Sequence, residues 1–278
     1  MTSLQKETPA QLNHLCVDSP QPERLARFYC EMMDCAETPL NELRLLSGPR
    51  RSILIRPGAT ADLAYAAYRI STDSQLQTLR CRLAANDIAC EPLHDPLLEP
   101  GSFVVADPQG RQTAFGVACH TLPHSGAPAR LQHCVFQTTE LDDVVRFYVD
   151  KLGFTVSDEV VSDDSRAAAV FLRSDDDHHT LAFFRGSRNE WDHHCYETNE
   201  WNDIRDWGDR FAAAEIPIFF GPGRHGPGNN LFFMVTDPDG NRLEFSAELQ
   251  QVSIDSTAGV WPASERTLNS WGRAWMRS

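Results

Sequence analysis

The sequence lacks three features that would point to particular classes of protein. It has only 25 lysines and arginines against 39 aspartates and glutamates, a net charge of −14. Such an acidic chain repels the phosphates of nucleic acids and anionic membranes, so we expect neither as a partner. No apolar run is long enough to span a bilayer, and residues 1–11 lack the apolar core of a signal peptide. We therefore expect a cytoplasmic protein.

Cysteine pairs of the kind that bind zinc are also missing. None of the eight cysteines forms a C-x-x-C pair, which excludes a zinc ribbon. Cys16, Cys134 and Cys195 lie in apolar, strand-like runs, where reduced cysteine behaves as a small hydrophobic residue. At 278 residues the chain buries enough surface to fold without disulfides, and its length suggests about two domains.

One segment of the chain occurs twice. Residues 12–35 match residues 131–154 at an offset of 119, with a histidine in third position and a Phe-Tyr pair in the helix that follows. Residues 103–115 match residues 233–245 at an offset of 130, around the shared turn Asp-Pro-x-Gly. We therefore predict two tandem modules, residues 1–122 and 129–278, separated by a polar stretch that contains Pro and Gly.

Each module has the same pattern of predicted elements. A short strand is followed by a capped helix, further strands, a second helix and a hairpin that turns on Asp-Pro-x-Gly. The expected strands include 12–17, 51–55 and 63–70 in the first copy and 131–137, 167–172 and 195–198 in the second, and the second helices are 74–86 and 202–214. This order predicts an α+β fold of tandem βαβββ modules, whose curled mixed sheets enclose a pocket.

Two histidines and a glutamate of the second module predict a metal site. His133 opens the first strand, His194 is expected to open a central strand, and Glu244 lies on the last strand. Two histidines and one carboxylate on one face are typical of Fe(II) enzymes that activate oxygen. His193 competes with His194 for the second position; the similarity of His133-Cys134 to His194-Cys195 favours His194.

The first module serves as an internal control. His14 is the counterpart of His133, but the positions that correspond to His194 and Glu244 hold Ala66 and Ala114. The first module should therefore lack a complete metal site, and the metal should bind only to the second.

These residues carry a resemblance to a known family. The opening His and helical Phe-Tyr, the sequence His-His-Thr-Leu-Ala at 178–182, Gly-Arg-His at 223–225 and the ending at 237–245 resemble the vicinal oxygen chelate superfamily, and within it the two-module extradiol catechol dioxygenases. The resemblance implies Fe(II), occasionally Mn(II), held by His133, His194 and Glu244. It also implies a reaction of a small catecholic compound with O₂.

The same resemblance assigns two further histidines and exposes one departure. It implies that His179 assists oxygen activation and proton transfer, and that His225 hydrogen-bonds the substrate hydroxyl. A solvated His179 in an acidic run and a flexible loop around His225 are the competing interpretations. The family's tyrosine ten residues before the glutamate is Met234 here, which cannot exchange a proton. Phe232 and Arg224 are further candidates for the substrate pocket.

Two alternatives to a ring-cleaving dioxygenase stay open. The chain could be another metal-dependent enzyme of the superfamily, an isomerase or a dioxygenase acting on a non-catechol, as Met234 suggests. It could also be a non-catalytic protein that binds an aromatic ligand. We expect a homo-oligomer, and we expect the tryptophan-containing tail, residues 250–278, to pack on its own module or a neighbouring subunit and to help close the pocket.

Overall fold

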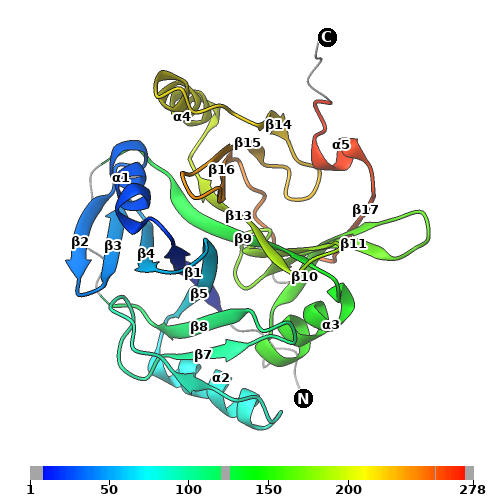
Figure 1. Ribbon diagram of the computed structural model, residues 1–278. Helices are drawn as coiled ribbons and strands as arrows, with labels where there is room; N and C mark the ends of the chain where they lie inside the picture. Colours follow the sequence, from blue (N-terminus) through cyan, green and yellow to red (C-terminus); the bar gives the residue numbers. More distant parts are fainter. Residues whose placement is uncertain (1–8, 120–125, 254, 273–278) are drawn as a thin grey trace.

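The computed structural model describes residues 9–119, 126–253 and 255–272. Within these residues the chain forms two mixed β-sheets, and the two halves of the chain lie side by side (Figure 1). None of the helices in the described ranges is long and apolar enough to cross a membrane. The α+β fold predicted from the sequence is confirmed, whereas the limits proposed for the two domains stay a prediction because residues 120–125 lie outside the described part.

The first half begins with a strand that becomes the centre of its sheet. The elements are β1 (Ala10–Ser19), α1 (Pro22–Met32), β2 (Ala36–Leu40), β3 (Leu43–Gly48), β4 (Arg51–Pro57), β5 (Asp62–Ile70), α2 (Asp73–Ala84), β6 (Glu91–Pro92), β7 (Phe103–Ala106) and β8 (Gln112–Val117). The strand order across the sheet is β2-β3-β4-β1-β5-β8-β7-β6.

The second half repeats this arrangement and adds a strand and a short helix at its end. The elements are β9 (Arg130–Thr138), α3 (Leu141–Arg146), the π-helix η2 (Phe147–Leu152), β10 (Thr155–Val161), β11 (Ala167–Arg173), β12 (Leu181–Arg185), β13 (Glu190–Glu197), α4 (Trp201–Ala213), β14 (Phe220–Arg224), β15 (Leu231–Thr236), β16 (Arg242–Ala247), β17 (Gly259–Pro262) and α5 (Glu265–Leu268). The strand order is β14-β15-β16-β13-β9-β12-β11-β10-β17.

Apart from β17, the two sheets have the same order, which is the structural form of the sequence repeat. In each, the first strand lies parallel to one neighbour and antiparallel to the other: β4 and β5 beside β1, and β12 and β13 beside β9. The structural counterpart of residues 51–55 is therefore β12, not residues 167–172 as the order along the chain suggested.

One apolar core joins the two halves. Phe28 of α1 stacks on Phe211 of α4 with ring centroids 6.4 Å apart, and Tyr68 of β5 meets Phe154 edge to face at 5.6 Å. The hydroxyl groups of Thr113 and Tyr148 share a hydrogen bond of 2.9 Å across the same boundary. Because these rings are buried, the core fixes one sheet against the other.

The predicted central strand of the second half begins too late. We expected a strand over residues 195–198, but β13 begins at Glu190 and pairs with β9 through a bulge between Trp191 and His193. His193 and His194 therefore lie in the middle of a strand, where successive side chains point to opposite faces.

Candidate metal centre and active site

The register of three neighbouring strands brings the candidate ligands to one face. Cys195 of β13 lies opposite His133 of β9 in the antiparallel pair and opposite Glu244 of β16 in the parallel pair. Residues in such positions project to the same side of a sheet, as do residues two apart in a strand. His133, His193, Cys195 and Glu244 therefore all project from the same face.

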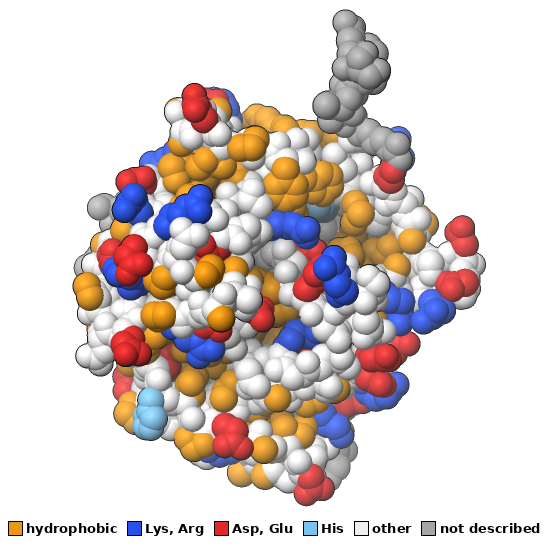
Figure 2. All heavy atoms as spheres, in the orientation of Figure 1, with side chains coloured by type: hydrophobic (Ala, Val, Ile, Leu, Met, Phe, Trp, Pro, Cys, Tyr) orange, Lys and Arg blue, Asp and Glu red, His pale blue; other side chains and the backbone are white. Residues whose placement is uncertain are grey.

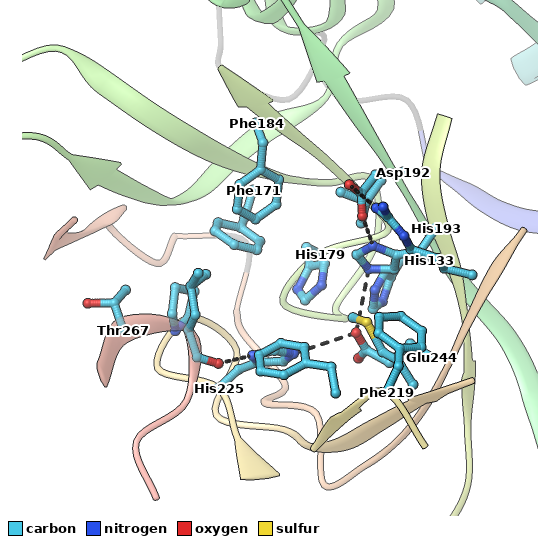
Figure 3. A pocket seen from close by; sticks show the side chains of 16 residues that line it. His133, Phe171, His179, Phe184, Asp192, His193, Phe219, His225, Glu244 and Thr267 are labelled. Atoms are coloured by element: carbon cyan, nitrogen blue, oxygen red, sulfur yellow. Dashed lines mark hydrogen bonds and ion pairs between the residues drawn. The ribbon is translucent and has the colours of Figure 1, made fainter. Parts of the chain in front are cut away.

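Their side chains converge in the interior. The Nε2 atom of His193 lies 3.5 Å from Oε2 of Glu244, and the rings of His133 and His193 are 5.7 Å apart (Figure 3). Potential ligand atoms of His133, Cys195 and Glu244 lie within 4.8 Å of one another. Glu244 is only 1% exposed, so its carboxylate is almost completely removed from bulk water.

The prediction that His194 is the second ligand is wrong. His194 lies opposite Cys134 and points to the other face of the sheet. There its Nε2 atom lies 3.2 Å from the hydroxyl of Tyr29, and its ring stacks on Trp191 at 4.9 Å. Because a shift of one residue exchanges the faces of a strand, the ring that meets Glu244 is that of the competing candidate, His193.

Hydrogen bonds at Nδ1 set the orientation of three histidines. Nδ1 of His133 bonds to the side-chain oxygen of Gln132, whose amide group donates to the carbonyl of His179 at 2.5 Å. Nδ1 of His193 bonds to Oδ1 of Asp192 at 2.6 Å, and Nδ1 of His225 bonds to the carbonyl of Leu268 at 2.5 Å.

These partners accept hydrogen bonds, so each Nδ1 carries the proton of the neutral ring and each Nε2 presents a lone pair to the pocket. Metal-binding histidines are oriented by partners of this kind.

The donor set fits a divalent metal ion. The Nε2 atoms of His193 and His225 both lie 3.5 Å from Oε2 of Glu244. All three atoms carry lone pairs and would repel one another, so either additional protons or a cation must lie between them. Burial alone would raise the pKa of Glu244, but the interactions of its carboxylate with His225 and His193 lower it. Burial, followed by the nearby histidines, lowers the pKa of His133 well below its usual value. A neutral imidazole and an ionised carboxylate are the forms that bind metal.

The two further histidines predicted from the sequence both line the pocket. His179 is 3% exposed, and its ring lies 4.4 Å from that of His133, so it is not a solvated residue of the acidic run. Burial, followed by its histidine neighbours, lowers its pKa. His225 is held between the Leu268 carbonyl and the ring of Phe232, stacked at 3.7 Å, so its loop is firmly packed.

The three candidates for the substrate pocket have different outcomes. Met234 lies opposite Glu244 in the β15–β16 pair and lines the pocket, so the departure from the family's tyrosine falls inside the site. Phe232 is fully buried behind His225. Arg224 lies outside the pocket lining and pairs with Glu248 at 2.6 Å, so the structure does not place it in the substrate pocket.

The pocket is a small, mainly apolar cavity of about 220 Å³. Its apolar wall comprises Val135, Phe171, Phe184, Phe219, Phe220, Met234 and Leu268. Figure 2 shows hydrophobic side chains around a hollow near the C-terminal segment, with a histidine visible inside it. Thr267 and Leu268 of α5 belong to the lining, so the tail helps to close the pocket as expected; Trp275 lies outside the described residues.

The first module fills the corresponding place without a full ligand set. In the first sheet, Ala67 of β5 lies opposite both His14 of β1 and Ala114 of β8. Ala114 therefore stands where the second sheet has Glu244, and Tyr65, two residues before Ala67, stands where the second sheet has His193. His14 and Tyr65 both bond to Asp95, at 2.8 and 2.6 Å. This closed network of side chains satisfies the buried polar groups internally.

Sequence reasoning missed the residues that support the ligands. Gln132 orients His133, and Asp192 orients His193 while pairing with Arg242 at 3.0 Å. Each immediately precedes its histidine, and a polar residue directly before a proposed ligand is the one signal that could have found them.

Comparisons with known proteins find relatives in sequence and in fold. A model of the Glyoxalase/Bleomycin resistance protein/Dioxygenase superfamily matches residues 130–245, which include the three proposed ligands. Metapyrocatechase 2 of Cupriavidus necator is 33% identical over 149 residues, covering 52% of this chain and 45% of that protein. The aligned part thus spans about half the length of that relative.

Two further matches cover most of the chain. An iron-dependent extradiol dioxygenase of Rhodococcus jostii (strain RHA1) is 27% identical over 256 residues, 83% of each protein. The crystal structure of homoprotocatechuate 2,3-dioxygenase from Arthrobacter globiformis superposes with a TM-score of 0.86 at 20% identity, covering 97% of this chain and 90% of that one. The resemblance seen in the sequence is confirmed for the second half of the chain, where residues 130–245 match the glyoxalase/bleomycin resistance protein/dioxygenase superfamily.

Proposed function

We propose that the protein is an Fe(II)-dependent extradiol-type dioxygenase that opens the ring of a small catecholic compound with O₂. The observation that carries the proposal is one buried face on which His133, His193 and Glu244 converge, beside two histidines that line the same cavity. Two histidines and a carboxylate on one face leave coordination positions open. The family match and the names of the relatives support the same chemistry.

Fe(II), with Mn(II) as the alternative, would be held by these three side chains and would supply electron transfer between the aromatic diol and O₂. The chain's own contribution is to position the reactants and to manage protons. His225 presents the Nε2 lone pair to the pocket and would accept a proton from a substrate hydroxyl. His179, beside His133, is the second residue that would exchange a proton there.

The pocket favours a small substrate without a charged substituent. Its volume of about 220 Å³ lies below the roughly 300–1,000 Å³ typical of pockets for drug-sized ligands. Among the described lining residues the only Lys or Arg is Arg242, and its guanidinium group is paired with Asp192. An aromatic ring fits against the apolar wall, whereas a carboxylate substituent would find no unpaired cation.

Oxygen uptake tests the proposal. Protein loaded with Fe(II) under anaerobic conditions is mixed with uncharged, alkyl-substituted and carboxylated catechols, and oxygen consumption is followed together with the absorbance of a yellow ring-opened product. We expect uptake with the uncharged compounds and none from Glu244→Ala. Iron-loaded protein that consumes no oxygen with any catechol would contradict the proposal.

Met234 favours a second candidate function, a metal-dependent reaction on a compound other than a catechol. A thioether cannot exchange a proton with a phenolic hydroxyl. Metal content separates this enzyme from a metal-free binding protein. A wild-type protein that binds iron but consumes no oxygen with catechols, and that loses the iron in His193→Ala, would favour the second candidate. A homo-oligomer remains our prediction for the assembly, to be measured by light scattering.

A further inference from the structure

A second buried histidine stands directly behind His179. His178 is 2% exposed and is not among the residues that line the cavity. Its Nδ1 lies 3.1 Å from Nδ1 of His179, and its Nε2 lies 3.0 Å from Oδ2 of Asp158 on β10. A line of three groups therefore runs from the pocket to a carboxylate on the neighbouring part of the sheet.

The carboxylate at the end of this line is held by the tail. Gly259 of β17 donates its backbone N–H to Oδ1 of Asp158 at 2.9 Å, and Nε1 of Trp261 donates to Oδ2 at 2.7 Å. Burial would raise the pKa of Asp158, but the hydrogen bonds that it accepts from His178, Trp261 and Gly259 outweigh burial and lower the pKa. Asp158 is therefore ionised at neutral pH and only accepts hydrogen bonds.

The direction of each bond in the line follows from this acceptor. Because Asp158 only accepts, Nε2 of His178 carries its proton, and Nδ1 of the neutral ring is then an acceptor. The short contact between the two Nδ1 atoms needs one donor, which must be His179. With its proton on Nδ1, His179 presents a lone pair at Nε2, as do His133, His193 and His225.

We propose that Asp158 and His178 are positioning residues that hold His179 in the Nδ1–H tautomer, so that its Nε2 atom faces the pocket as a proton acceptor. With Asp158 ionised and both imidazole rings neutral, the tautomer follows from these contacts, whereas its use in catalysis rests on the proposed function. A carboxylate that orients a histidine base in this way is a recurring device in enzymes, and loss of the carboxylate gives the wrong tautomer and a slower reaction.

Nitrogen NMR measures the tautomer directly in the metal-free protein. The histidines are labelled with ¹⁵N, and the resonances of His179 are assigned from the signals lost in His179→Gln. We expect His179 to be predominantly Nδ1–H in the wild type and to lose this preference in Asp158→Leu and in His178→Phe. Asp163→Asn, on the exposed loop after β10, is the control and should leave the spectrum unchanged.

A wild-type His179 that is predominantly Nε2–H would overturn the proposal, as would an unchanged tautomer in both variants. Circular dichroism and thermal unfolding verify that each variant is folded, and Asp158→Glu provides a conservative variant that should restore part of the Nδ1–H population.

Kinetics test the catalytic part separately. With a catechol that the wild type cleaves, kcat of Asp158→Leu should fall about 100-fold, the lower end for loss of general acid–base catalysis, while KM changes little. A shifted tautomer with unchanged kcat would refute the catalytic role. If no catechol is cleaved, the proposed function fails, but the NMR result still decides the tautomer.

Discussion

Replacing each of two adjacent histidines should produce opposite effects. His193 meets Glu244 through its Nε2 atom, whereas His194 packs on the far side of the same strand against Tyr29 and Trp191. His193→Ala should therefore abolish metal binding and leave the fold stable. His194→Ala should weaken the fold and leave the metal ligands in place.

The magnitudes follow from these contacts. Loss of a residue that merely orients a ligand lowers metal affinity about 10–100-fold, so loss of the ligand His193 should lower it by more than ~100-fold. Removal of the His194 ring leaves a cavity beside Trp191 and a Tyr29 hydroxyl without its partner. Together these cost about 3 kcal/mol of unfolding free energy, or about 5 °C in Tm for a chain of this size.

Two assays separate the outcomes. Metal affinity is measured by competition with a chromophoric chelator under anaerobic conditions, and stability by thermal unfolding of the metal-free proteins. His194→Phe is a further control, because it keeps a ring against Trp191 and should recover part of the lost stability. Metal binding that survives in His193→Ala but disappears in a folded His194 variant would refute the assignment of the two faces.

Three other predictions concern the same site. Metal at 100 times its Kd should add about 2.7 kcal/mol to the unfolding free energy and raise Tm by roughly 4–5 °C; a Glu244→Ala protein whose Tm rises equally would show that the metal binds elsewhere. Asp192→Asn should lower metal affinity about 10–100-fold by loosening His193, measured by chelator competition against the exposed control Asp206→Asn; equal affinities would show that Asp192 is dispensable. Met234→Tyr should raise the turnover of catechol in the oxygen assay, and an unchanged or lower rate would mean that the pocket is shaped for another compound.

The repeat explains why the fold could be predicted and one ligand could not. Offsets of 119 and 130 paired the two copies well enough to place His133 on the first strand of the module and Glu244 on its last, the two strands that flank β13 in the sheet. The choice between His193 and His194 depends on the bulge before His193 and on which β9 residue each faces, and these are properties of strand pairing. The similarity of His133-Cys134 to His194-Cys195 suggested that His194 is equivalent to His133, whereas in the sheet the residue opposite His133 is Cys195.

The residues that position His178 and His179 could not be predicted from the sequence. Asp158 is 20 residues from His178, which it meets directly, and Trp261, 83 residues from His178, reaches Asp158 because β17 pairs with β10. No spacing rule connects a strand residue, a paired histidine and a tail tryptophan. The departure at Met234, in contrast, was visible in the sequence, because it lies close to Glu244 in the same hairpin.

The late position of β17 and α5 in the chain has a consequence for how the protein is made. Domains fold largely in the order of synthesis, so the strands of both sheets up to β16 can assemble before β17 and α5 are translated. Those residues supply Trp261 to Asp158, the Leu268 carbonyl to His225 and part of the cavity wall. A nascent chain would therefore have His133, His193 and Glu244 in place before the residues that orient its proton acceptors, which defers full reactivity until β17 and α5 have been translated.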